Sequence, residues 1–153
     1  TYETKPGQYE EYDAFMTVAE QELTKMHNMI NQLHAVQENL KEMLKEVSDP
    51  AVKKEGEKLL ADMKSWDEDM VQRKSQAYDD VENFPNKFSA EYIFMINQTS
   101  STIPRLNKAS KDRKVELDAQ WVGLKSRGNQ FINTAIPAYN KVLWEAGIGA
   151  LRL

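Results

Sequence analysis

A long run of apolar residues, spaced at alternating steps of four and three, dominates the first third of this 153-residue chain. Such spacing keeps one helix face apolar over many turns and is typical of a helix in a bundle or coiled coil. Pro6-Gly7 precedes the run and Ser48-Asp49-Pro50 follows it. We therefore expect one helix from about Gln8 to Val47, roughly 60 Å long. Its seam contains Met16, Ala19, Leu23, Met26, Ile30, Leu33, Gln37, Leu40, Leu44 and Val47, of which only Gln37 is polar.

The same four-three spacing of apolar residues begins again directly after Ser48-Asp49-Pro50. Asp49 before Pro50 predicts a helix N-cap followed by a first-turn proline, so the chain reverses and a second helix starts at once. We expect this helix to pack antiparallel to the first as a hairpin and to end near Val81, because Pro85 disfavours helical backbone at Phe84. Gly56 and Arg73 interrupt its apolar seam, which runs through Val52, Gly56, Leu59, Met63, Trp66, Met70, Arg73 and Ala77.

The second half of the chain carries weaker signals. Residues 88–96 are the most apolar stretch, and their surroundings favour a short helix over residues 86–99 rather than a strand. Residues 98–114 are polar, so we expect an exposed connection or a frayed helix start. The apolar period returns at Val115, and Pro137 should kink or split this last helix because proline lacks the amide that a helix interior needs.

Together these patterns predict an all-α fold, an antiparallel bundle of three to four helices with two long helices forming an N-terminal hairpin. Gly147 should end the last helix and leave a short, extended, apolar tail. We expect residues 1–153 to form a single helical-bundle domain. A chain of this length buries roughly 70 % of its unfolded surface, so its core needs no disulfide or metal cross-links. The central core should contain Met63, Trp66, Trp121 and Leu124.

Composition excludes several classes of site. The chain has no cysteine, which removes disulfides, thiolate zinc sites, iron–sulfur clusters and thiol nucleophiles. Its net charge is -4, so a nucleic-acid partner is not expected. No apolar run approaches the roughly 18 residues of a spanning helix, so no membrane span is expected either.

The two histidines give little support for a metal site. His27 and His34 lie seven residues apart, whereas two ligands for one metal on a helix usually lie three or four apart, because two helical turns separate the rings by roughly 10 Å. Neither belongs to the Glu-x-x-His motif of di-iron bundles, because Thr24 and Asn31 occupy the glutamate positions. We expect no metal and no cofactor, and the seven methionines are interpreted as core filling. A ligand-, haem- or metal-carrying bundle that uses one of these histidines with a seam methionine stays open as an alternative.

Catalytic motifs are equally scarce. Carboxylates are abundant, but a glycosidase needs two of them facing across a cleft about 5 to 9.5 Å apart, and long bundle helices offer no obvious cleft. The sequence contains no Gly-x-Ser-x-Gly elbow and no glycine-rich phosphate loop. We therefore interpret the carboxylates as solvated helix faces and expect no enzyme activity in this chain.

One local cluster is more specific, at the predicted end of the second helix and the turn that follows. Two interpretations compete for it. In the structural one, Asp80 or Asn83 caps the next helix while Phe84 staples it; in the other, the cluster binds a partner. Its members are Tyr78, Asp79, Asp80, Asn83, Phe84, Pro85 and Phe88.

The stretch from Ser75 to Lys87, with Tyr78-Asp79-Asp80 followed by Asn83-Phe84-Pro85, resembles a segment in the C-terminal helical region of bacterial sortilin-like, neuraminidase-repeat (BNR) β-propeller proteins. These proteins are often described as glycosyl hydrolases. The ending 139–148 also resembles that family's closing helix, and the first two helices match in length and order. The sequence departs from the family pattern at 88–92 and has no firm match across 99–111.

This resemblance implies the C-terminal module of a longer, exported protein, located in the periplasm or at the cell surface. The family's propeller is absent from this chain, so no catalytic position carries over. The resemblance thus favours a non-catalytic protein-interaction or spacer module whose partner is a β-propeller domain or another subunit of an envelope complex. A helical accessory part of a glycoside hydrolase, using Asp79 or Asp80, is a further alternative. The predicted partner-binding residues are Tyr78, Asp80, Asn83, Phe84, Pro85 and Leu151.

Overall fold

The computed structural model describes residues 6–73 and 87–153, and within them every regular element is helical. The all-α bundle expected from the sequence is therefore confirmed. The elements are α1 (Gln8–Leu44), α2 (Pro50–Met70), α3 (Phe88–Ser100), α4 (Lys108–Gln130), a π-helical turn η2 (Phe131–Ala135) and α5 (Ile136–Glu145).

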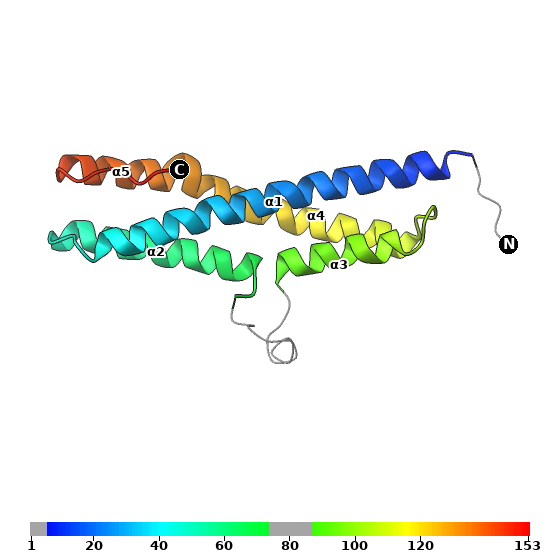
Figure 1. The fold of residues 1–153 in the computed structure, drawn as a ribbon, viewed down its shortest axis with the longest axis horizontal. Helices are drawn as coiled ribbons and strands as arrows, with labels where there is room; N and C mark the ends of the chain where they lie inside the picture. The colour runs from blue at the N-terminus through cyan, green and yellow to red at the C-terminus, as the bar shows by residue number, and fades with distance from the viewer. Residues whose placement is uncertain (1–5, 74–86) are drawn as a thin grey trace.

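These helices form three parallel rods of similar length (Figure 1). The first rod is α1 alone. The second consists of α2 and α3, which lie end to end and run antiparallel to α1. The third consists of α4, η2 and α5, which return in the direction of α1. The expected hairpin of α1 and α2 is present, but α2 covers only half of α1, and α3 packs on the other half.

The apolar seam of α1 is buried along most of its length. Ala19, Met26, Leu33 and Leu40 are fully inaccessible to solvent. The helix ends at Leu44 rather than at the predicted Val47. The amides of the next two residues bond carbonyls only three residues back, which tightens the last turn.

The start of α2 follows the prediction and its end does not. Asp49 caps the helix by accepting hydrogen bonds from the amides of Ala51 and Val52 at 2.9 and 3.4 Å. The predicted continuation to Val81 is wrong, because the helix ends at Met70 and Val71 has extended backbone. The physical reason is a side-chain pair across the break, described below. Residues 74–86 lie outside the described part of the chain.

The helix predicted over 86–99 is present as α3 and is not a strand. Of the two possibilities predicted for residues 98–114, an exposed connection or a frayed helix start, the second applies from Lys108, where α4 begins. The side chain of Asn107 caps that helix by accepting from the amide of Ser110 at 2.7 Å. A pair between Lys108 and Asp112, 2.7 Å apart, supports the first turn. This first part of α4 is mainly polar, so the apolar period could not reveal it.

The interruption predicted at Pro137 takes the form of the π-helical turn η2. This wider turn ends just before Pro137, which occupies the second position of α5. A proline is tolerated in the first turn of a helix, because its missing amide is not needed there. The third rod therefore continues past the proline as α5.

Both expected core tryptophans are buried. Trp66 is 0 % exposed, and its indole Nε1 donates to the carbonyl of Leu124 at 2.7 Å. Trp121 is 3 % exposed and stacks on Phe88, with ring centroids 6.2 Å apart. Met63 is fully buried and Leu124 half-buried, so the predicted central core is confirmed.

Replacing Trp66 by alanine should lower the free energy of unfolding by about 3 to 5 kcal/mol, because it removes a large buried side chain and leaves a cavity. The matched control is Trp144→Ala, since Trp144 is 81 % exposed and its loss should change stability by no more than about 0.5 kcal/mol. Urea unfolding followed by circular dichroism measures both. Equal losses of unfolding free energy in the two variants would show that Trp66 does not belong to the core.

Gly56 should resist substitution for a packing reason. A Cβ atom at Gly56 would lie 2.3 Å from the Tyr139 hydroxyl oxygen and 2.6 Å from Leu44 Cδ2. That hydroxyl donates to the carbonyl of Val52 at 2.9 Å and joins α5 to α2. Gly56→Ala should therefore lower stability by about 1 to 3 kcal/mol. Gly123→Ala, an exposed position in α4 with open space around it, should raise it by about 0.5 to 1 kcal/mol. Thermal melts of both variants make the comparison, and a gain in both would contradict the close approach at Gly56.

Candidate functional site

Most of the predicted partner-binding residues cannot be placed. Tyr78, Asp80, Asn83, Phe84 and Pro85 lie outside the described residues, as does Asp79. Their predicted role stays a prediction.

Leu151, the remaining predicted contact, belongs to the core of this chain. It is 3 % exposed. The side-chain amide of Asn140 holds its backbone from both sides, accepting from the Leu151 amide at 2.7 Å and donating to the Leu151 carbonyl at 3.1 Å. Gly147, with φ of +76°, permits the reversal that brings the tail back onto α5. The side chain of Leu151 therefore offers no surface to a partner.

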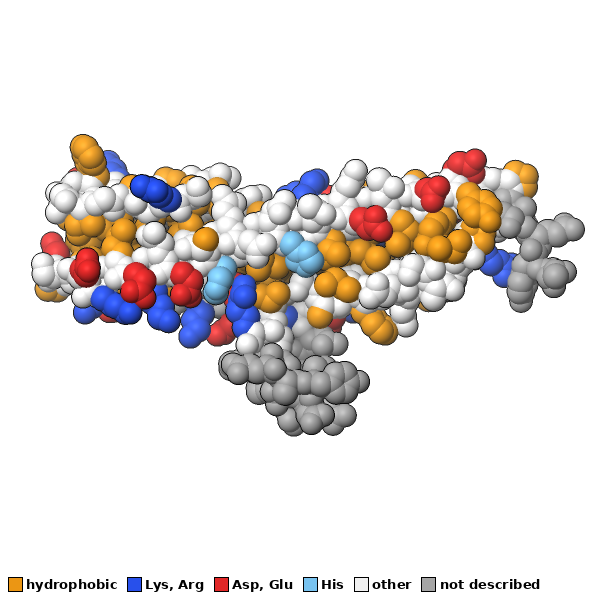
Figure 2. Space-filling model, viewed as in Figure 1, with side chains coloured by type: hydrophobic (Ala, Val, Ile, Leu, Met, Phe, Trp, Pro, Cys, Tyr) orange, Lys and Arg blue, Asp and Glu red, His pale blue; other side chains and the backbone are white. Residues whose placement is uncertain are grey.

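The histidines are arranged as their spacing suggests. Both are visible on one face of the bundle (Figure 2); His27 is exposed, and His34 lines a concave surface. Residues 6–73 and 87–153 contain no group of three or more histidine or acidic side chains placed to share a metal ion.

The candidate site is an open groove of about 590 Å³ on the flank of α1 and α2, next to the break between α2 and α3. We call it the flank groove. One wall comes from α1 and the other from α2 and the residues that follow it, and Lys87, the residue before α3, also lines the groove. The described residues that line it are His34, Gln37, Glu38, Lys41, Leu60, Lys64, Asp67, Glu68, Val71, Gln72, Arg73 and Lys87.

An ion pair between a buried aspartate and an exposed arginine builds the wall of the groove at the end of α2. Arg73 folds back and binds the Asp67 carboxylate with two hydrogen bonds, of 2.7 Å from Nε and 3.0 Å from Nη2. The Asp67 side chain is only 6 % exposed. The hydrogen bonds to Asp67 raise the pKa of Arg73 above its usual value despite partial burial, so the guanidinium stays charged. Side chains six residues apart on a helix point to different faces. Arg73 can therefore bind Asp67 through two nitrogens only where the backbone between them leaves the helix, which explains why α2 ends at Met70.

Two polar atoms in the groove have no hydrogen-bond partner. Gln37, which is 6 % exposed, leaves its Nε2 amide unpaired, and His34 leaves Nδ1 unpaired. The other ring nitrogen of His34 lies 4.0 Å from a Glu38 oxygen. A buried donor without an acceptor destabilises the fold by about 1 to 3 kcal/mol. Two of the side chains that line the groove thus each have a buried polar atom whose hydrogen-bonding capacity is unsatisfied.

A second polar cluster joins α1, α3 and α4 but has a structural role. The Trp121 indole donates to Glu22 at 2.9 Å, and the Tyr92 hydroxyl donates to Asp118 at 3.0 Å. Burial, followed by the charge of Asp118, raises the pKa of Tyr92 well above its usual value. Burial alone would raise the pKa of Glu22, but the hydrogen bonds from Lys25 and Trp121 outweigh it and lower that pKa. Tyr92 therefore keeps its proton, and these bonds hold the three helices together.

Sequence reasoning noticed Gln37 as the polar exception on the seam of α1 but did not assign it to a site. It interpreted Arg73 as an interruption of an apolar seam and missed its pairing with Asp67. An acidic residue adjacent to the seam of α2, followed by an arginine outside helical spacing, was the available signal.

Comparisons with models of known protein families, with curated proteins and with solved structures found no significant match. No helix among the described residues is long and apolar enough to cross a membrane.

Replacing Gln37 by leucine should raise the free energy of unfolding by about 1 kcal/mol, because it removes the unpaired donor and adds apolar burial. Gln32→Leu is the matched control, since Gln32 lies exposed on the same helix and its change should stay within about 0.5 kcal/mol. Urea unfolding of both variants tests this. A marked loss of stability in Gln37→Leu would mean that the amide has a partner in solution.

Proposed function

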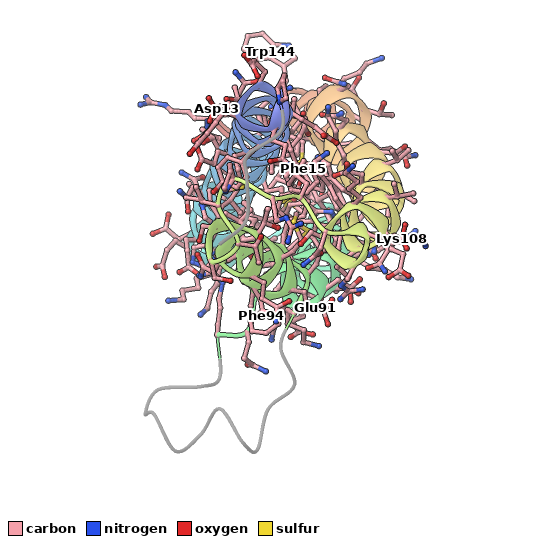
Figure 3. All side chains as sticks on the ribbon, turned by 90° about the vertical axis from the view of Figure 1, so that its right-hand side faces the viewer. Asp13, Phe15, Glu91, Phe94, Lys108 and Trp144 are labelled. Carbon is pink, nitrogen blue, oxygen red and sulfur yellow. The ribbon has the colours of Figure 1, made fainter. Side chains whose placement is uncertain are left out.

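We propose that this chain is a non-catalytic interaction and spacer module of an exported protein. Its partner is a β-propeller domain or another subunit of an envelope complex. The sequence resemblance to sortilin-like proteins supports the choice of partner. The observation that carries the interaction role is Trp144, a tryptophan that projects from the outside of the bundle (Figure 3) and is 81 % exposed.

The spacer role is supported by the length and stiffness of the bundle. α1 contains 37 residues and so spans about 55 Å. Buried side chains from all three rods, from Tyr12 near one end of the bundle to Leu143 near the other, belong to one core cluster. A rod with a continuous core keeps a fixed distance between whatever is bound at its two ends.

The interaction role is supported by the C-terminal end of the third rod. Trp144 lies on the last turns of α5, and Leu153 in the adjoining tail is 55 % exposed. The bonds from Asn140 hold this tail in place. Tryptophan is the side chain that most often dominates the binding energy of protein interfaces, and a fixed scaffold lowers the entropy cost of binding. The turn residues 78–85 stay predicted contacts of the same module.

The test begins with the sequence of the unprocessed gene product upstream of Thr1, where we expect a region of repeated strands. That region, expressed separately, should bind this chain saturably in isothermal titration calorimetry. Trp144→Ser should weaken binding at least about tenfold, because it removes an anchor worth more than 1.4 kcal/mol. Val122→Ser, at a position that is 69 % exposed on α4, is the matched control and should leave affinity unchanged.

Two results would count against the proposal. An initiator methionine directly before Thr1 would exclude a propeller in the same polypeptide. Equal affinities of the Trp144→Ser and unmodified chains would show that this end of the rod does not dock.

A further inference from the structure

The flank groove is built to receive a hydrogen-bond acceptor. Gln37 occupies a seam position of α1, where its neighbours along the seam are apolar, and its side chain is more than nine-tenths buried. Its Nε2 group lacks an acceptor within the described chain. The Nε2 atom itself is buried beneath the groove surface, so an acceptor oxygen from outside the chain satisfies this donor once the side chain turns outward into the groove. Within the chain the cost of burying the donor stays uncompensated.

His34 supplies a second unsatisfied atom close to the first. It lies three residues before Gln37, so the two side chains share a face of α1. Its Nδ1 is also without a partner. One bound molecule lying along this face could meet both side chains.

The charges around the groove favour an anionic occupant. Lys41, Lys64 and Lys87 line it, and none of them has an ion-pair partner within residues 6–73 and 87–153. Asp67 is already neutralised by Arg73, which leaves Glu38 and Glu68 as the opposing acids. Four cationic and three anionic side chains thus line the groove, although the whole chain carries a charge of -4.

The groove also has an apolar component. Leu60 and Val71 lie among its polar residues and are only partly buried by the chain itself. A peptide segment combines all three requirements, because its backbone carbonyls accept hydrogen bonds, its acidic side chains pair with lysines and its apolar side chains cover Leu60 and Val71. A concavity of about 590 Å³ at the surface also has room for several residues of an extended chain.

We propose that the flank groove is a docking site for an acidic peptide segment of a partner protein, in which carboxylate side chains flank an apolar residue. The site is separate from the Trp144 end of the rod, so either can fail without the other. In the complex, a peptide carbonyl accepts from Gln37 Nε2. The acidic side chains lie against the lysines at the rim.

The test is fluorescence anisotropy of the full chain with a fluorescein-labelled peptide, Gly-Glu-Asp-Phe-Glu-Leu-Gly. We expect saturable binding that weakens as ionic strength rises, because exposed charges contribute to it. A peptide with Gln and Asn in place of Glu and Asp should bind at least about tenfold more weakly. Replacing its Phe and Leu by Ala should also weaken binding, because the contact with Leu60 and Val71 is lost.

Two protein variants locate the site. The double variant Lys41→Glu and Lys64→Glu should lose at least about tenfold in affinity. Its matched control, Lys54→Glu with Lys58→Glu, makes the same charge change at exposed positions of α2 outside the groove and should lose little. Gln37→Leu should weaken binding about fivefold or more while the variant stays folded, a combination that general destabilisation cannot produce.

Three outcomes would overturn the proposal: no saturable binding, equal binding of the acidic and neutral peptides, or equal losses in the two double variants. A last arm replaces residues 76–84 by a glycine–serine linker within the full chain. Tighter peptide binding by that variant would identify the chain's own acidic Tyr78–Phe84 stretch as the occupant and would overturn the assignment to a partner protein.

Discussion

Burial of the α1 seam is the interaction on which the rest of this structure depends. α1 is the only one of the described helices that extends along the whole bundle, and the shorter helices α2, α3 and α4 pack against it. Isolated helices of ordinary composition are marginal in water, so α2 and α3 owe their stability mainly to this packing, while α5 depends on its packing against α2. A continuous seam on one helix allows interruptions elsewhere, because each shorter helix needs only its own part of the seam.

The interruption in the second rod places the flank groove. α2 stops where Arg73 turns back onto Asp67, and the rod resumes only at α3. A carboxylate near the C-terminus of a helix is disfavoured by the helix dipole, and the guanidinium compensates for this. The same pair fixes the extended residues after α2 as a wall. The concavity thus follows from ending a helix beside an uninterrupted one.

The sequence predicted the parts of the fold that rest on periodicity or on capping chemistry. The seam of α1, the Asp49-Pro50 start of α2 and the burial of Trp66 all follow from local spacing. The end of α2 did not, because Arg73 pairs with Asp67 only once the backbone leaves the helix. The start of α4 at Lys108 stayed open between a connection and a helix start for a different reason: this helix begins with a cap and a polar first turn, which carry no apolar signal. The groove itself depends on how α1, α2 and Lys87 meet in space, so only Gln37 gave an indication of it.

Gln37 has a competing explanation, since a single polar residue on a bundle seam can fix the register of the helices. Such a residue acts by pairing with a polar group on the facing helix. The Gln37 amide has no such partner. The register of α1 against α2 is also fixed without it, because only five residues separate the two helices and Asp49 caps the second. The bond from Tyr139 to Val52 then sets the third rod against α2. A register role for Gln37 would therefore duplicate constraints that already exist, whereas an acceptor from outside the chain accounts for both its burial and its unpaired amide.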